Sequence, residues 1–139
     1  MTAPNISNPT HPAAAMNQVR LPRTAALGPG LGGQPRLLID APAGAAEIYL
    51  HGATLTSWVP RGGSEVIFTS RQAVFDGSTA IRGGIPLCLP EFGVGINGDA
   101  VPKHGWARIA PWQLRTVTGT DDGGVRALLS VSRDRLTAL

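Results

Sequence analysis

Arg82 and the two glycines that follow it form the first feature of this sequence that could bind an anion. A guanidinium offers five donors in a planar fork that fits phosphate oxygens or sugar hydroxyls. Gly83 and Gly84 let the backbone turn tightly and let a ligand approach it closely. The alternative interpretation is that Arg82 forms an ion pair with Asp76 or Glu91 and only stabilises a loop. The glycine pair is not a phosphate-binding P-loop, since no Lys-Ser or Lys-Thr follows it.

A second group of polar side chains lies in residues 103–108. Side chains at even separations in an extended strand face the same side, so we expect His104, Trp106 and Arg108 to line one wall of a site. The indole ring offers an apolar face to a pyranose ring, and His104 and Arg108 offer hydrogen bonds to hydroxyls or to an anion. Lys103 adds a positive charge beside them. The alternative interpretation is a surface histidine next to a core tryptophan.

The other histidines and the single cysteine predict neither a metal site nor a thiol nucleophile. His51 precedes Gly52 and is expected at a turn or a strand end, and His11 lies in the N-terminal segment. Isolated histidines lack the spacing of metal ligands, so we expect no metal and no other cofactor. Cys88 lies in the apolar run 85–90 and is predicted to be a small buried hydrophobic residue. A lone cysteine excludes an intrachain disulfide and fits a reducing, cytoplasmic location.

Composition and charge narrow the class of protein. The 139 residues include 18 glycines and 12 prolines, and 42% are hydrophobic, which is enough for a packed core. No apolar run approaches the roughly 18 residues of a membrane helix, and Gly or Pro interrupts nearly every window of helical length. The net charge is +3, but the arginines stand singly, whereas a nucleic-acid binder concentrates them on one surface. We therefore expect a soluble, β-rich protein that binds neither nucleic acid nor a membrane.

Short strands separated by turn signals must position these side chains. The residue pattern predicts strands at residues 36–40, 46–50, 53–59, 65–69, 112–117 and 125–131, with a hairpin loop at 119–124. Their spacing of about ten residues favours an antiparallel sandwich or barrel. Residues 70–108 form a long loop that is too rich in large apolar residues to be a linker, and such loops are usually functional. Residues 1–33, rich in Pro, Gly and Ala, are predicted to be a disordered leader before a domain at 34–139.

Several motifs, taken with their order and spacing, resemble one family. They are HGATLTSW at 51–58, FDG at 75–77, IRGGIP at 81–86, PEFG at 90–93 and KHGWAR at 103–108. On these residues the chain resembles the hexose-6-phosphate mutarotases, the glucose-6-phosphate 1-epimerase branch of the aldose 1-epimerase (galactose mutarotase-like) superfamily. The resemblance implies an all-β antiparallel supersandwich. It also implies an isomerase of carbohydrate metabolism that interconverts the α and β anomers of a hexose 6-phosphate.

The resemblance implies roles for individual residues. Arg82 and Arg108 match the family's substrate-binding arginines, which contact phosphate and sugar oxygens, and His104 matches the histidine that lines the pocket. Lys103 stands where the family often has glutamine or another polar residue, and we count it with the substrate-binding residues. Glu91 stands where the family commonly has an apolar or aromatic residue, so it is not predicted to be the catalytic base.

The chain departs from the family in length. By resemblance, the catalytic histidine and glutamate and a substrate-binding aspartate belong to a later part of the family's fold, and no residue here matches them by motif. The sequence is therefore expected to be the N-terminal half of a mutarotase, with the substrate-binding residues and without catalysis of its own. The alternative is a non-catalytic sugar-phosphate-binding protein or a vestigial one. Because half a sandwich leaves strand edges and a sheet face uncovered, the chain alone is expected to self-associate.

Overall fold

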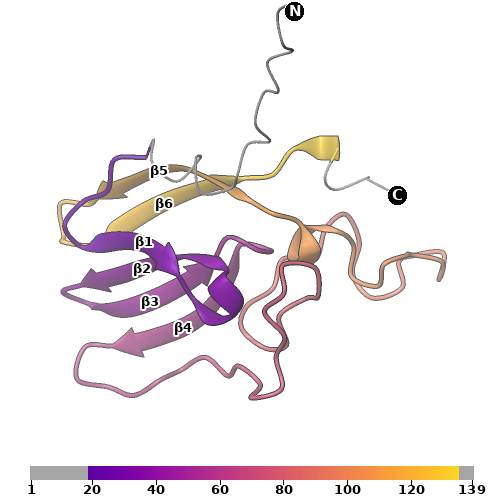
Figure 1. The fold of residues 1–139 in the computed structure, drawn as a ribbon, viewed down its shortest axis with the longest axis horizontal. Coiled ribbons are helices and arrows are strands. Elements are labelled where there is room, and N and C mark those ends of the chain that lie inside the picture. Colours follow the sequence, from indigo (N-terminus) through magenta and orange to yellow (C-terminus); the bar gives the residue numbers. More distant parts are fainter. Residues whose placement is uncertain (1–18, 135–139) are drawn as a thin grey trace, which may run out of the picture.

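A computed structural model of the chain describes residues 19–134, and its regular structure is almost entirely antiparallel β-strand (Figure 1). In chain order the elements are β1 (Ala25–Pro29), the 3-10 helix η1 (Leu31–Gly33), β2 (Pro35–Ala41), β3 (Gly44–Tyr49), β4 (Thr54–Pro60), the 3-10 helix η2 (Ala107–Ile109), β5 (Gln113–Gly119) and β6 (Val125–Ser130). The predicted all-β antiparallel fold class is confirmed. In the described part of the chain, no helix is long and apolar enough to cross a membrane.

The strands form a sheet and a hairpin that pack on each other. Strands β1 to β4 follow one another in an antiparallel sheet, and β5 and β6 form the separate hairpin. Leu37 of β2, Leu50 after β3, and Leu114 and Val117 of β5 make one buried cluster. Since these residues come from both sheets, the hairpin covers the sheet face that carries Leu37, as the stacking in Figure 1 shows.

The opposite face of the four-stranded sheet carries polar side chains, because neighbours along a strand point to opposite faces. Arg36 of β2 forms an ion pair with Glu47 of β3. The Glu47 carboxylate also accepts a hydrogen bond of 2.6 Å from the Thr56 hydroxyl of β4. Arg61, just after β4, pairs with Asp40 of β2 at 2.7 Å. The charges on this face are therefore paired across the strands.

Most of the predicted strands are confirmed: the segments 36–40, 46–50, 53–59, 112–117 and 125–131 correspond to β2, β3, β4, β5 and β6, and Thr120 to Gly124 close the hairpin. The strand predicted at 65–69 is wrong. The Glu65 carboxylate accepts hydrogen bonds from the backbone N–H groups of Trp58 and Ile67, at 2.9 and 2.8 Å. A side chain thus takes donors that a strand ladder would use. The segment keeps single backbone bonds, from the Val66 amide to Trp58 and from the Gly84 amide to Phe68, and only its Thr69 forms a β-bridge.

The structure differs from the predicted leader over residues 25–33, where β1 and η1 form. The sequence of β1 has little strand propensity of its own, but β2 supplies it with backbone partners from Ala25–Ile39 to Pro29–Pro35. Its Ala25 and Leu27 side chains also pack against the core cluster. Tertiary contacts therefore outweigh local composition here. Residues 1–18 of the predicted leader lie outside the described residues.

Candidate functional site

The candidate residues lie in the irregular segment between β4 and β5, at one end of the four-stranded sheet (Figure 1). Single antiparallel bridges join this segment to the sheet end and to itself, at Leu55–Ile85, Thr69–Gly83 and His51–Pro111, and a parallel one joins Leu89 to Gly105. Single bridges at a few residues therefore hold this segment, and no continuous β-ladder of the described residues does.

Residues 103–108 form a turn that leads into η2, so the extended wall predicted from alternation is wrong. His104 adopts the left-handed region, with φ of 70°, and this reverses the chain where a strand would continue. Its amide donates to the carbonyl of Gly93 at 2.7 Å, and its Nδ1 accepts from the Gly93 amide at 3.0 Å. The imidazole also meets the Phe92 ring edge-on, with centroids 4.9 Å apart. The turn nevertheless keeps Lys103, His104 and Arg108 together.

The surroundings of His104 favour the neutral form of its imidazole. Desolvation, followed by the positive charges of Arg108 and Lys103, lowers the pKa of His104 below its ordinary value of 6.5. Since Nδ1 accepts a hydrogen bond from Gly93, the proton of the neutral ring sits on Nε2. That nitrogen is a donor, which suits a sugar hydroxyl or a phosphate oxygen.

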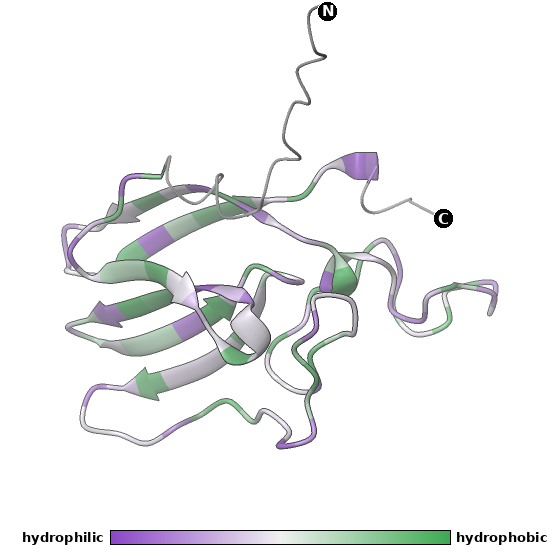
Figure 2. Cartoon of the chain, viewed as in Figure 1, coloured by the Kyte–Doolittle hydropathy of each residue, from purple (hydrophilic) through white to green (hydrophobic). Residues whose placement is uncertain are grey.

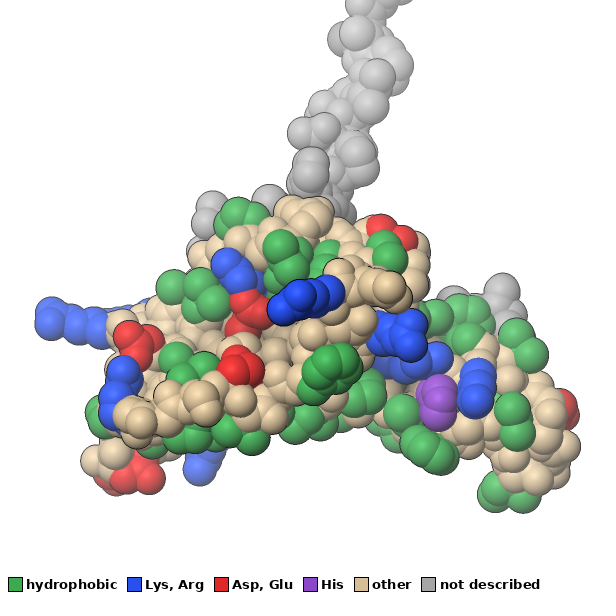
Figure 3. All heavy atoms as spheres, turned by 90° about the horizontal axis from the view of Figure 1, so that it is seen from below, with side chains coloured by type: hydrophobic (Ala, Val, Ile, Leu, Met, Phe, Trp, Pro, Cys, Tyr) green, Lys and Arg blue, Asp and Glu red, His purple; other side chains and the backbone are tan. Residues whose placement is uncertain are grey.

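Arg108 is tied to the same turn by its side chain. Its Nη2 donates to the carbonyl of Lys103 at 2.8 Å, while its buried Nε has no hydrogen-bond partner within residues 19–134. The Arg108 guanidinium is thus held against the backbone of the turn that carries His104. Figure 3 shows a histidine flanked by Lys and Arg side chains at this end of the molecule, with hydrophobic side chains around them.

Arg82 is exposed and forms no ion pair with Asp76, Glu91 or any other carboxylate of the described residues. The Asp76 carboxylate instead accepts from the amides of Ser78 and Thr79, at 2.8 and 2.7 Å, and from the Thr79 hydroxyl. These hydrogen bonds hold the pKa of Asp76 far below its usual range. The alternative interpretation of Arg82 as a loop-stabilising partner of a carboxylate is therefore wrong.

The glycines after Arg82 serve backbone packing. Gly83 has φ of 107°, and a Cβ there would lie 2.6 Å from the carbonyl oxygen of Phe68. The amide of Gly84 donates to that same oxygen at 2.8 Å, and the amide of Ile85 donates to the carbonyl of Leu55 at 2.9 Å. The two glycines thus let the Arg82 segment lie directly against the start of β4.

The Arg82 and Arg108 segments reach the same end of the sheet. In the Arg82 segment, the amide of Ile85 donates to the carbonyl of Leu55 in β4. The Arg108 segment continues to Trp112, whose amide donates to the carbonyl of Leu50 at 2.9 Å. The structure therefore brings the Lys103–His104–Arg108 cluster together directly and places Arg82 on a neighbouring loop anchored to the same strands.

Sequence reasoning missed two residues that shape this region. Phe92 packs edge-on against His104, and Asp76 caps the turn before Arg82. The run Asp76-Gly77-Ser78-Thr79 carried a usable signal, because aspartate commonly bonds the amides two and three residues ahead of it. No comparable sequence signal marks Phe92.

The remaining predicted residues fall outside the cluster. His51 lies at a turn between β3 and β4, as expected, and is buried. Cys88 is half-buried with a free thiol, whereas a buried position was predicted. In the described part of the chain, no three His, Cys, Asp or Glu side chains lie together as metal ligands.

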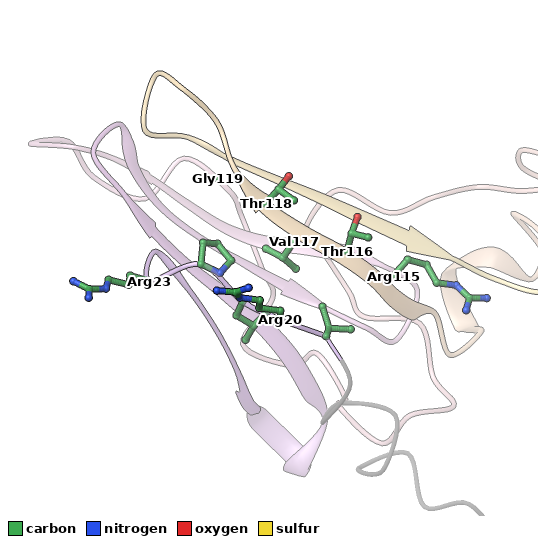
Figure 4. Close-up of a pocket in the computed structure, with 10 residues that line it drawn as sticks. Arg20, Arg23, Arg115, Thr116, Val117, Thr118 and Gly119 are labelled. Atoms are coloured by element: carbon green, nitrogen blue, oxygen red, sulfur yellow. The ribbon is translucent and has the colours of Figure 1, made fainter.

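A groove of about 560 Å³ lies elsewhere, between residues 19–23 and strand β5. Arg20, Arg23 and Arg115 line it. Figure 4 shows that the guanidiniums of Arg23 and Arg115 point away from the groove in opposite directions. The three arginines therefore do not converge on one ligand.

Comparison with known proteins assigns a family to this fold. Residues 35–136 match the family model described as aldose 1-epimerase. Over 101 residues the chain is 37% identical to a Salmonella typhimurium protein named "Putative glucose-6-phosphate 1-epimerase", covering 73% of this chain and 34% of that protein. An Escherichia coli protein of the same name is 40% identical over 87 residues, covering 63% of this chain and 29% of that protein. The chain thus spans about a third of the length of these curated relatives.

A solved structure supports the same assignment. The crystal structure of a protein titled "putative mutarotase (YeaD)" from Salmonella typhimurium superposes with a TM-score of 0.73 at 32% sequence identity. The superposition covers 86% of this chain and 40% of that one. The family-model match over residues 35–136 includes strands β2 to β6 and the loops between β4 and β5.

Proposed function

The chain belongs to the aldose 1-epimerase family, and from this premise we propose that it binds a hexose 6-phosphate and serves the interconversion of its α and β anomers. The relatives named as glucose-6-phosphate 1-epimerases support the choice of a phosphorylated sugar. We further propose that the protein acts in the cytoplasm, since its single cysteine suits a reducing compartment.

Four side chains make up the proposed substrate site. Arg82 and Arg108 bind the phosphate and nearby sugar oxygens, and Lys103 adds positive charge. The Nε2 proton of His104 is donated to a sugar hydroxyl or a phosphate oxygen. Phosphate is a good match for this cluster because each of its oxygens accepts charge-assisted hydrogen bonds, which contribute about 1.5–3 kcal/mol each.

One observation carries the proposal: within the described residues, the cations of the site have no carboxylate partner, whereas the two arginines at the four-stranded sheet do. Arg36 and Arg61 form ion pairs with Glu47 and Asp40. In residues 19–134, no carboxylate pairs with Arg82, Lys103 or Arg108. A cluster of positive charges without counter-charges lowers the free energy of a bound dianion.

The proposed contribution of these residues is binding rather than proton transfer. Opening and reclosing a pyranose ring needs one group that takes the proton of the anomeric hydroxyl and another that protonates the ring oxygen. A cluster of arginine, lysine and neutral histidine supplies donors but no carboxylate base. We propose that residues 1–139 supply binding and not this acid–base pair, so that the chain alone binds the sugar without accelerating its mutarotation.

Two measurements on the full chain test this function. Isothermal titration should give a Kd for glucose 6-phosphate at least about tenfold lower than the Kd for glucose. Equal affinity for both sugars would contradict phosphate recognition. Polarimetry on glucose 6-phosphate should show the spontaneous rate, and turnover that disappears in His104→Ala would contradict the proposed division between binding and proton transfer.

The exposed hydrophobic residues near the site support a further part of the proposal, that the chain self-associates. Of the eleven large hydrophobic residues exposed within 19–134, nine lie in residues 66–101, including Phe68 and Phe92 at 76% and 77%. Figure 2 shows hydrophobic stretches along these loops. Apolar surface of this kind is normally covered by other protein. Sedimentation should show concentration-dependent association, and a monomer at every concentration would contradict it.

A further inference from the structure

His51 is buried between the two segments that carry the proposed binding residues. Only 4% of its surface is exposed. Its Nε2 lies 2.8 Å from the carbonyl oxygen of Thr79. Because a carbonyl oxygen only accepts, Nε2 carries the proton in this contact. The proposed function makes no use of this side chain, although a buried hydrogen bond of this kind is costly to lose.

One side of His51 faces the Arg82 segment. Thr79 is held from two directions, since its amide donates to Asp76 at 2.7 Å and its carbonyl accepts from His51. Ile81, next to Arg82, is 6% exposed and anchors the chain beyond Thr79. The His51 hydrogen bond therefore fixes the run that leads into Arg82, whose own carbonyl accepts from the Ser70 amide at 2.9 Å.

The backbone of His51 and Gly52 faces the Arg108 segment. His51 forms an antiparallel bridge with Pro111, and the amide of Gly52 donates to the carbonyl of Ala110 at 2.8 Å. The α-carbon of Gly52 also packs on Arg108, because a Cβ there would lie 2.4 Å from the Arg108 carbonyl oxygen. The same two residues thus touch both halves of the proposed site.

We propose that His51 is a positioning residue, whose buried imidazole holds the Arg82 segment in register with the Arg108 segment. The effect of His51 on ligand binding rests on the proposed function, whereas its effect on the position of the Arg82 segment does not. Without the Nε2 hydrogen bond, the Arg82 segment loses its link to residues 51–52. The Arg108 segment keeps its own, because the bond from Gly52 to Ala110 is made by the backbone.

Three variants separate positioning from general destabilisation. His51→Phe fills the space without a donor, and His51→Gln can place an amide N–H near the position of Nε2. Thr54→Val is the matched control, because the Thr54 hydroxyl, 1% exposed as a residue, donates to the carbonyl of His51 at 3.2 Å. The control removes a buried hydrogen bond from the same turn and leaves the contact between His51 and Thr79 in place.

The first readout is affinity of the full chain for glucose 6-phosphate, with thermal unfolding measured alongside. We expect His51→Phe to raise Kd about tenfold, and His51→Gln to restore most of the affinity. Thr54→Val should lower Tm and leave Kd nearly unchanged. Losses of affinity that follow Tm in both His51→Phe and Thr54→Val would overturn the positioning role.

The second readout needs no ligand. The amides of Gly84 and Ile85 donate to the carbonyls of Phe68 and Leu55, so their hydrogen exchange reports how firmly the Arg82 segment is held. We expect exchange at both amides to speed up about tenfold in His51→Phe and to stay near the wild-type rate in Thr54→Val. If wild-type protein binds no glucose 6-phosphate, the proposed function fails while this readout still tests His51. Unchanged exchange in His51→Phe would overturn the inference.

Discussion

The four-stranded sheet and the loops between β4 and β5 satisfy their polar groups in opposite ways. In this sheet, strand partners use the backbone donors, and Arg36 and Arg61 have carboxylate partners. In the loops, single bridges replace ladders, and Arg82 and Arg108 have no carboxylate partner within the described residues. Stability and ligand binding are therefore expected to depend on different residues. Substitutions in the sheet should lower stability, and substitutions in the loops should weaken ligand binding.

The largest effect is expected in the core of the sheets. Leu37 is completely buried in the cluster shared with β5. Leu37→Ala should lower the free energy of unfolding by about 2–5 kcal/mol, because it removes methyl groups and leaves a cavity. Chemical denaturation measures this. Leu128→Ala in β6, where the side chain is 56% exposed, is the control and should change it by less than about 0.5 kcal/mol.

A substitution at Gly105 should damage the loops and spare the sheets. Gly105 has φ of 74°, and a Cβ there would lie 2.0 Å from the carbonyl oxygen of Leu89. Gly105→Ala should therefore raise the Kd for glucose 6-phosphate more than about tenfold, with about 1–3 kcal/mol of backbone strain. Gly98→Ala is the matched control, since Gly98 has φ of 75° but nothing within 4 Å. Equal effects of the two variants would show that strain, rather than the contact with Leu89, explains the loss.

Removing one arginine of the site should affect binding and leave folding unchanged. Arg82→Ala and Arg108→Ala should each raise the Kd for glucose 6-phosphate about tenfold, while binding of glucose changes less. Titration calorimetry with both sugars gives the comparison. Arg126→Ala removes the same charge from an exposed position on β6 and serves as control. Equal losses with both sugars would place the arginines on the sugar ring instead of the phosphate.

The smallest expected effect is a pH dependence of stability caused by His104. Its pKa is lowered in the folded chain by desolvation and by Arg108 and Lys103, so below about pH 6.5 the unfolded chain binds a proton that the folded chain does not. The stability of wild type relative to His104→Gln should therefore fall as the pH drops below about 6.5, and it should level off once folded His104 is protonated. Thermal unfolding of both proteins across this range measures it. If the stabilities of the two proteins changed in parallel across this pH range, the lowered pKa of His104 would be contradicted.

The sequence predicted the strands whose side chains alternate, and failed where another part of the fold decides the conformation. Strands β5 and β6 follow from alternation and the glycines between them. Strand β1 does not, because its pairing comes from β2 rather than from its own Ala- and Gly-containing sequence. The segment 65–69 has strand propensity, but the Glu65 carboxylate occupies the backbone donors.

For the candidate site, the sequence predicted that three of its residues lie together, but not their local structure. The types and spacing of Lys103, His104 and Arg108 indicated an anion-binding cluster, and the structure brings them together. A non-glycine residue with positive φ leaves no reliable mark in a sequence, so the turn at His104 could not be foreseen. The alternation of side chains predicted an extended strand at residues 103–108, whereas these residues form a turn that still keeps Lys103, His104 and Arg108 together.

An amide NMR titration of the full chain with glucose 6-phosphate tests most directly whether the loops form the ligand site. We expect the signals of Arg82 and of residues 103–108 to shift together with one Kd, while the signals of β2, β3 and β6 remain in place. Glucose at the same concentrations should produce much smaller shifts. Shifts centred on the groove between residues 19–23 and β5, or no saturable shifts at all, would contradict the assignment of the site.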